Sequence, residues 1–188
     1  MGQITDIDGN TYKTVVIGKQ GWMAENLNVS KYRNSDPIPQ VQDEDEWAEL
    51  TTGAWCYYEN ETENGKIYGK LYNWYAVNDP RSLAPKGWHI PNIDEWGILI
   101  DYLGGEDVIG GKMKESGTTH WNSPNTDATN ESGFTALPGG SRDSLDGIFN
   151  HIGYYGLWWS STESYTLHAY YRRLAYQTIY VNKRIPLK

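Results

Sequence analysis

The stretch NIDEWGILIDYLGG, residues 92–105, decides the fold class. Asn92 is a residue type that caps helix N-termini, and Glu95 three residues later completes a capping box. Apolar side chains then recur at helical spacing until Gly104-Gly105 ends the pattern. We therefore predict a helix from Ile93 to Leu103 that packs on a twisted antiparallel sheet. Its buried side chains should be Trp96, Leu99, Ile100 and Leu103.

Segments with strand propensity lie on both sides of this helix. Residues 4–17 predict a hairpin around the turn Asp8-Gly9-Asn10, and residues 22–27 predict a third strand. Further strands are expected at 157–161, 168–176 and 178–185. Shorter helices are expected at 43–50, capped by Asp43, and at 107–115, where Gly110-Gly111 interrupts the pattern. The order predicts a single α+β domain, residues 1–188, with long loops.

The composition fits one domain whose core is aromatic. Nine Trp and 15 Tyr accompany only two Phe in 188 residues, so buried rings must find partners for their N–H and O–H groups. The net charge of −8 argues against nucleic-acid binding. The sequence has no run of 18 apolar residues, so we expect no membrane span.

Six ordered blocks carry a resemblance to a known family. The first three are Gly21-Trp22-Met23-Ala24-Glu25-Asn26-Leu27, Thr51-Thr52-Gly53-Ala54-Trp55-Cys56 and Tyr68-Gly69-Lys70-Leu71-Tyr72-Asn73-Trp74. The last three are residues 85–91 with Glu95-Trp96, residues 133–140 and residues 158–163. In this order they resemble the Fibrobacter succinogenes major paralogous domain family over nearly the whole chain.

The resemblance implies a C-type-lectin-like fold, similar to that of formylglycine-generating enzymes. It also implies a secreted or lipid-anchored protein at the surface of a bacterium, with the signal segment absent from this chain. The family's last strand, of the type Gly-Phe-Ser-x-Arg-Cys, would follow Lys188, so we expect it to be missing together with the disulfide partner of Cys56. Some relatives on this fold are varied near the C-terminus by diversity-generating retroelements.

Catalytic and metal-binding motifs are absent from the sequence. The four histidines, His89, His120, His151 and His168, are dispersed and form no ligand spacing. Cys56 lies in an aromatic strand, where an inert buried thiol is expected, and one cysteine cannot supply the pair that formylglycine generation needs. We expect no enzyme activity, no metal site and no cofactor, although loop carboxylates and carbonyls can hold a structural calcium.

The C-terminal segment differs in charge from the rest of the chain. The first 163 residues contain all 24 acidic and 11 of the 16 basic residues, a net charge of −13, whereas residues 164–188 have five basic residues and no acidic one. Tyr and Arg, which are frequent here, contribute much contact energy at binding surfaces. The candidate binding residues are Tyr165, His168, Tyr170, Arg173, Gln177, Tyr180, Asn182 and Arg184.

Strand alternation assigns these side chains to two faces, with Tyr171 and Arg173 on one and Tyr170 and Arg172 on the other. We expect the side chains of one subset to be mostly exposed on one contiguous surface, and Leu174 and Tyr171 to be comparatively buried. That subset is Arg173, Gln177, Tyr180, Asn182 and Arg184. The alternative is that the rings of this region form the core, which we favour for Trp158 and Trp159.

The expected function is a non-catalytic surface recognition module that binds a protein or glycan through its C-terminal strands and adjoining loops. Two alternatives remain open. One is a structural subunit of a surface or fimbria-like assembly, in which a neighbour supplies the missing strand. The other is a carbohydrate-active enzyme. We expect a monomer or a weak oligomer.

Overall fold

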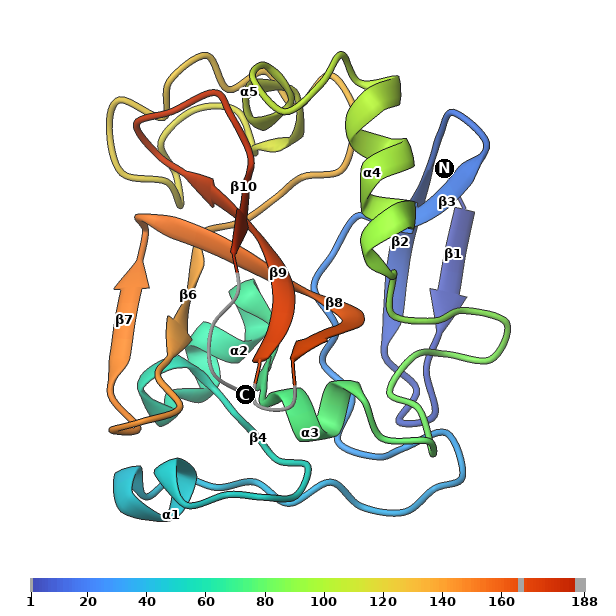
Figure 1. Ribbon diagram of the computed structural model, residues 1–188, viewed down its shortest axis with the longest axis vertical. Helices are drawn as coiled ribbons and strands as arrows, with labels where there is room; N and C mark the ends of the chain where they lie inside the picture. The colour runs from blue at the N-terminus through green and yellow to red at the C-terminus, as the bar shows by residue number, and fades with distance from the viewer. Residues whose placement is uncertain (1, 166–167, 185–188) are drawn as a thin grey trace.

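The computed structural model describes residues 2–165 and 168–184 and is mixed α+β (Figure 1). Its strands form several small antiparallel sheets rather than one large one. The first sheet is a meander in which a hairpin joins each strand to the next. Its strands are β1 (Gly2–Thr5), β2 (Thr11–Ile17) and β3 (Gln20–Met23). The hairpin predicted for residues 4–17 is confirmed.

The second three-stranded sheet has the order β10-β9-β8 and crosses the middle of the molecule (Figure 1). Its strands are β8 (Tyr155–Tyr165), β9 (His168–Ala175) and β10 (Asn182–Arg184). Two further sheets have two strands each: β4 (Trp55–Cys56) with β5 (Leu71–Tyr72), and β6 (Gly139–Arg142) with β7 (Phe149–Ile152).

The helices are short except for one. They are α1 (Glu44–Ala48), α2 (Thr62–Tyr68), α3 (Trp74–Val77), α4 (Ile93–Tyr102), α5 (Ile109–Met113) and the 3₁₀ turn η1 (Tyr58–Asn60). The Asn92 side chain accepts from the backbone N–H groups of Asp94 and Glu95, and the capping box is complete. The helix prediction is therefore confirmed, as is the Asp43 cap of α1.

Helix α4 holds the first two sheets together through one apolar cluster. Trp96, Leu99, Ile100 and Leu103 are all buried, as predicted, and pack with Ile17 and Trp22 of the first sheet and Leu174 of the second. A second cluster around Trp55 and Trp74 lies below it, and a third around Trp47 and Cys56 is adjacent to β4. Tryptophans occupy each cluster, in line with the composition.

Leu99 provides a direct test of this core, because its side chain is 0% exposed. We expect Leu99→Ala to lower the free energy of unfolding by about 2–5 kcal/mol, as deletion of a buried leucine side chain does. Ile98 on the same helix is 56% exposed, so Ile98→Ala should change stability by no more than about 0.5 kcal/mol. Urea denaturation of both variants measures the difference. Equal losses would contradict the packing of α4.

Some predicted boundaries were wrong. Strand β3 ends at Met23, and residues 24–27 continue as a loop in which Ala24 is buried, Asn26 and Leu27 are half-buried and Glu25 is exposed. The last predicted strand, residues 178–185, is strand only from Asn182 to Arg184, and residue 185 lies outside the described residues. Gly110-Gly111 does not interrupt α5. An added Cβ at Gly110 would lie 2.7 Å from the Ile179 carbonyl oxygen, so the glycine permits close backbone approach.

Among the described residues, no helix combines the length and the apolar character that a bilayer crossing requires.

Candidate functional site

A cleft of about 770 Å³ lies between the sheets, and several separate segments of the chain line it. One wall is β3 with residues 24–27, and another is formed by Tyr68 and residues 70–74. The loop of residues 83–91 and the first turn of α4 form the mouth. Residues 134–144 and strand β8 complete the enclosure. Residues more than a hundred positions apart in the sequence thus line the same cleft.

Aromatic rings are frequent in the lining, and their positions are fixed by packing and hydrogen bonds. The rings of Trp22 and Trp96 lie 4.8 Å apart, and the Phe134 ring contacts Trp158 edge-on at 5.9 Å. The indole N–H of Trp158 donates to the Asn26 side-chain oxygen at 3.0 Å, and that of Trp159 donates to the Tyr72 carbonyl at 2.9 Å. Because the polar end of each indole is bonded, the rings hold one orientation.

Asn26 connects two walls of the cleft. Its side-chain oxygen accepts from Trp158 on β8, and its side-chain nitrogen donates to the carbonyl of Tyr68 at the end of α2, at 2.8 Å. The Asn26 amide therefore uses both a donor and an acceptor to hold segments 42 and 132 residues away.

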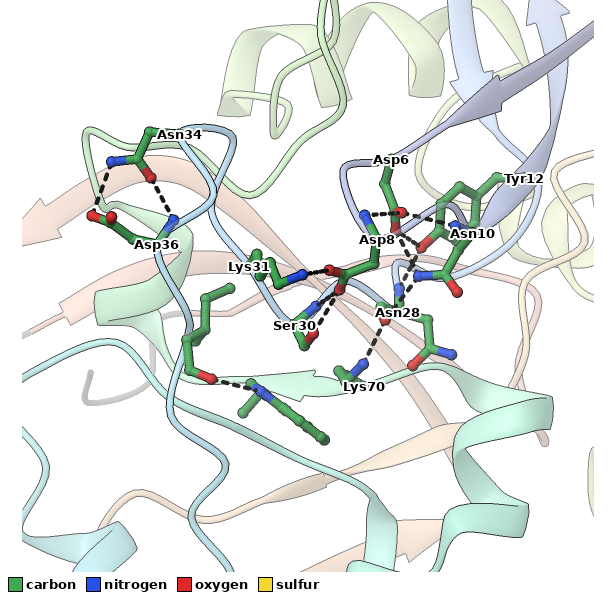
Figure 2. A network of polar contacts seen from close by, with 12 residues as sticks. Asp6, Asp8, Asn10, Tyr12, Asn28, Ser30, Lys31, Asn34, Asp36 and Lys70 are labelled. Atoms are coloured by element: carbon green, nitrogen blue, oxygen red, sulfur yellow. Dashed lines mark hydrogen bonds and ion pairs between the residues drawn. The ribbon is translucent and has the colours of Figure 1, made fainter.

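A polar network positions the loop of residues 28–31, which follows Asn26, as Figure 2 shows for Asn28, Ser30 and Lys31. The buried Asp6 carboxylate accepts from the Asp8 and Asn10 backbone N–H groups, the Asn10 side chain and the Tyr12 hydroxyl. The Tyr12 hydroxyl in turn accepts from the Asn28 backbone N–H at 2.9 Å. The turn between β1 and β2 thereby fixes the chain at the end of this cleft wall.

The same network continues through Asp8 (Figure 2). Its carboxylate accepts from the backbone N–H and hydroxyl of Ser30 and lies 3.3 Å from the Lys31 ammonium. Burial tends to raise the pKa of Asp8, but the bonds from Ser30 and Lys31 outweigh it and hold the pKa below its usual value. Asp8 therefore remains a carboxylate and keeps Ser30 and Lys31 in place.

Lys70 extends from the second wall toward this loop. Its ammonium donates to the Asn28 carbonyl at 2.5 Å and lies 4.3 Å from the centre of the Trp55 ring (Figure 2). Burial lowers the pKa of Lys70, while the charges of Asp8 and Asp6 act in the opposite direction. The ammonium thus contributes a positive charge beside an otherwise apolar wall.

The mouth of the cleft combines a ring with exposed polar groups. The Trp88 side chain is half-buried and lies over Gly21 of β3. His89 Nε2 is 2.7 Å from a Glu95 carboxylate oxygen, and the other oxygen accepts from the Asn92 backbone N–H at 2.9 Å. The Arg33 guanidinium donates to the carbonyls at both ends of this loop, Ala84 and Trp88. These hydrogen bonds therefore fix the Trp88 ring and the His89–Glu95 pair in place at the mouth of the cleft.

Arg142 also lines the cleft and is buried. Its guanidinium donates to four carbonyl oxygens at 2.8–2.9 Å and lies between two rings. The carbonyls belong to Val41, Gln42, Asp43 and Gly147, and the rings to Trp47 and Phe149. All its donors face the protein, so Arg142 has a structural role.

Cys56 is 0% exposed, as expected of an inert thiol. Burial raises the pKa of Cys56 to about 11, although the nearby Arg142 acts in the opposite direction. The thiol is therefore protonated at neutral pH and offers no nucleophile. Among the described residues, no three His, Cys, Asp or Glu side chains form a group that could hold a metal ion.

A sequence model of the Fibrobacter succinogenes major domain matches residues 15–185 of the 188. The chain belongs to this family. No curated protein and no solved structure gave a match. The match extends from β2 through β10 and therefore includes every element that lines the cleft.

Five of the six blocks that resemble the Fibrobacter succinogenes major domain line this cleft; the block of residues 51–56 does not. Sequence reasoning gave the order of the blocks, but the cleft residues were missed as candidate site residues. The signal that was available was the concentration of Trp and Tyr in those blocks.

The eight predicted binding residues lie outside the cleft lining, in several places. Tyr165 is exposed at the end of β8, and Gln177 and Tyr180 are exposed in the connection between β9 and β10. His168 and Tyr170 are half-buried on β9, and the Lys183 ammonium lies 4.5 Å from the Tyr170 ring centre. The remaining three residues, Arg173, Asn182 and Arg184, share one face of the β9–β10 pair.

The exposure predictions for this segment were partly wrong. Gln177, Tyr180 and Arg184 are exposed and Leu174 is buried, as predicted. Arg173 and Asn182 are only half-exposed, because Arg173 lies 4.6 Å above the Tyr155 ring and Asn182 is directly opposite it. Tyr171 is half-buried. Trp158 and Trp159 pack against the core clusters, as favoured for them.

Proposed function

We propose that the protein is a non-catalytic recognition module that binds a glycan segment in the aromatic cleft. The cleft itself carries this proposal. Its volume of about 770 Å³ lies within the range of about 300–1,000 Å³ that is usual for ligand pockets, and its lining combines aromatic rings with a few polar groups at its mouth. Sugars present C–H faces that stack on rings and hydroxyls that bond to groups such as His89 and Glu95.

The single cysteine of the sequence is unavailable as a nucleophile, which supports a binding role. Cys56 is buried and protonated, and the guanidinium of Arg142 is directed at backbone carbonyls. We further propose that the domain is C-type-lectin-like and is displayed at a bacterial surface, where glycans are the abundant ligands. Protease accessibility on intact cells tests that location.

Trp88 offers the sharpest test of the cleft, because its ring lies at the mouth and is only half-buried. We expect Trp88→Ala to weaken binding of a glycan selected on an array by about 2 kcal/mol, or roughly thirtyfold, as removal of a central aromatic anchor does. Isothermal titration calorimetry on the array's strongest hit measures the change.

The matched control is Tyr102→Ala, which removes a ring that is 65% exposed on α4 and outside the cleft. It should leave the affinity unchanged. If Trp88→Ala binds as the wild type does, and a double replacement of Tyr180 and Arg184 abolishes binding, the cleft is not the site and the C-terminal segment is.

A carbohydrate-active enzyme is the second candidate, favoured by the His89–Glu95 pair at the mouth. Prolonged incubation of the bound glycan followed by chromatography separates the two. Cleavage that is lost in Glu95→Gln while binding persists would replace the recognition module with an enzyme.

A further inference from the structure

One face of the sheet formed by β8, β9 and β10 continues the cleft wall. In an antiparallel sheet, directly opposed residues project to the same side. Two rows of opposed residues lie on this face: Leu157–Arg173–Asn182 and Trp159–Tyr171–Arg184. Leu157, Trp159 and Tyr171 line the cleft. Arg173, Asn182 and Arg184 therefore adjoin it directly, and we call these three the basic face.

The basic face contains donors that no acceptor occupies. Arg173 Nε and Asn182 Nδ2 are both buried, and neither has a hydrogen-bond partner within the described part of the chain. Their residues are opposite one another across β9 and β10. An unpaired buried donor costs about 1–3 kcal/mol. Both residues are half-exposed, so a rotation of each side chain would bring its donor to a ligand acceptor, and relief of this cost would favour binding.

The charge of this face is also uncompensated. Among the described residues, no acidic side chain forms an ion pair with Arg173 or Arg184, whereas the neighbouring Arg172 is paired with Glu106 at 2.8 Å on the opposite face. Burial raises the pKa of Tyr171, and the charges of Arg173 and Arg184 act in the opposite direction, so both arginines lie close to this cleft residue. The two arginines give the wall a local positive field.

We propose that the basic face is an anion-binding subsite of the cleft. The ligand is an acidic glycan whose uronate carboxylate binds Arg173, Asn182 and Arg184. This inference rests on the proposed function. A guanidinium fork and an amide match the planar, bidentate carboxylate better than they match a hydroxyl. The chain carries a net charge of −8, so a polyanion requires such a local site.

The test compares an oligogalacturonate with its fully methyl-esterified form, which has the same sugars and no charge. Calorimetry with the full chain should show tighter binding of the free acid. Arg184→Gln should weaken binding of the free acid at least about tenfold and leave binding of the ester unchanged. Arg173→Lys keeps the charge but removes the Nε donor, so it should also reduce the preference for the acid about tenfold.

Lys183→Gln is the matched control, because it changes the net charge equally on the same strand but on the opposite face. It should alter the affinity for the acid by no more than about twofold. If Lys183→Gln lowered the affinity for the acid as much as Arg184→Gln does, net charge alone would explain the effect, and the subsite would be overturned. Thermal unfolding of each variant verifies that the sheet is intact.

The remaining outcomes separate the two proposals. If acid and ester bind equally and only Trp88→Ala weakens them, the glycan cleft stands and the anionic subsite fails. If neither binds, the acidic-glycan subsite fails, and the glycan cleft is decided separately by Trp88→Ala with the glycan selected on the array. If a glutamate-rich peptide of equal charge binds more tightly than the oligogalacturonate and depends on the same arginines, the ligand is an acidic protein segment and the glycan assignment is overturned.

Discussion

Arg142→Met is expected to lower the free energy of unfolding by about 3–5 kcal/mol. The wild-type guanidinium satisfies four carbonyl oxygens, of which those of Val41 and Gly147 are fully buried. Each buried acceptor left without a donor costs about 1–3 kcal/mol. The substitution also removes the stacking of the guanidinium between two rings at 4.6 and 4.7 Å. Methionine fills similar space, so the loss reports mainly on the polar contacts.

Arg33→Met is the matched control for Arg142. The Arg33 guanidinium also donates to carbonyl oxygens, but its side chain is exposed, so water can replace it. Its loss should cost about 1 kcal/mol or less. Urea denaturation measures the free energy of unfolding of both variants. If the two variants lost similar free energies of unfolding, the burial of Arg142 would add nothing to stability.

Lys114→Met is expected to cost about 3 kcal/mol or more. The Lys114 side chain is 0% exposed, and its ammonium donates to the carbonyls of Thr126, Ala175 and Thr178 at 2.9–3.2 Å. These carbonyls belong to separate parts of the chain, which the ammonium joins at the end of α5. Without the lysine, three acceptors lose their donor.

Lys112→Met is the control, because Lys112 is two residues away and forms a surface ion pair with Glu131 at 3.1 Å. Such pairs contribute about 0–1 kcal/mol, so this variant should be nearly as stable as the wild type. A loss equal to that of Lys114→Met would contradict the role of the buried ammonium.

The pH dependence gives an independent check on Lys114. Burial lowers its pKa from 10.5 to about 8. Between these values the unfolded chain binds more protons than the folded protein, so the stability that Lys114 contributes rises with pH through this window. The difference in unfolding free energy between the wild type and Lys114→Met should therefore grow from pH 8 toward pH 10.5. All other ionisable groups are common to both proteins, so their contributions cancel in the difference.

Local signals explain which parts of the fold could be predicted. Helix α4 was predictable because its cap, its apolar spacing and its terminal glycines all lie within one short stretch. The turn between β1 and β2 was predictable for the same reason. The strand of residues 22–27 ended early because the core, rather than local propensity, determines where those side chains point.

The site depends on contacts that one sequence does not reveal. Alternation along β9 correctly placed Arg173 on the face of Tyr171, but its burial depends on Tyr155 of the neighbouring strand. Lys114 and Arg142 belong to residue types that are normally exposed, and their burial depends on carbonyl groups at loop ends far along the chain. The cleft likewise requires several distant segments, and their convergence is a property of the packed molecule alone.

The reach of Arg142 has a consequence for protein synthesis. Its bond to the Val41 carbonyl spans 101 residues, and the apolar cluster around Trp47 is covered by Phe149 from the same late segment. At a translation rate of about 5–20 residues per second, the ribosome needs roughly 5–20 s to reach residue 142 after residue 41 has been added. During that interval the Trp47 ring lacks its cover, so a pause in translation there exposes the nascent chain to aggregation and gives a holdase chaperone its opportunity to bind.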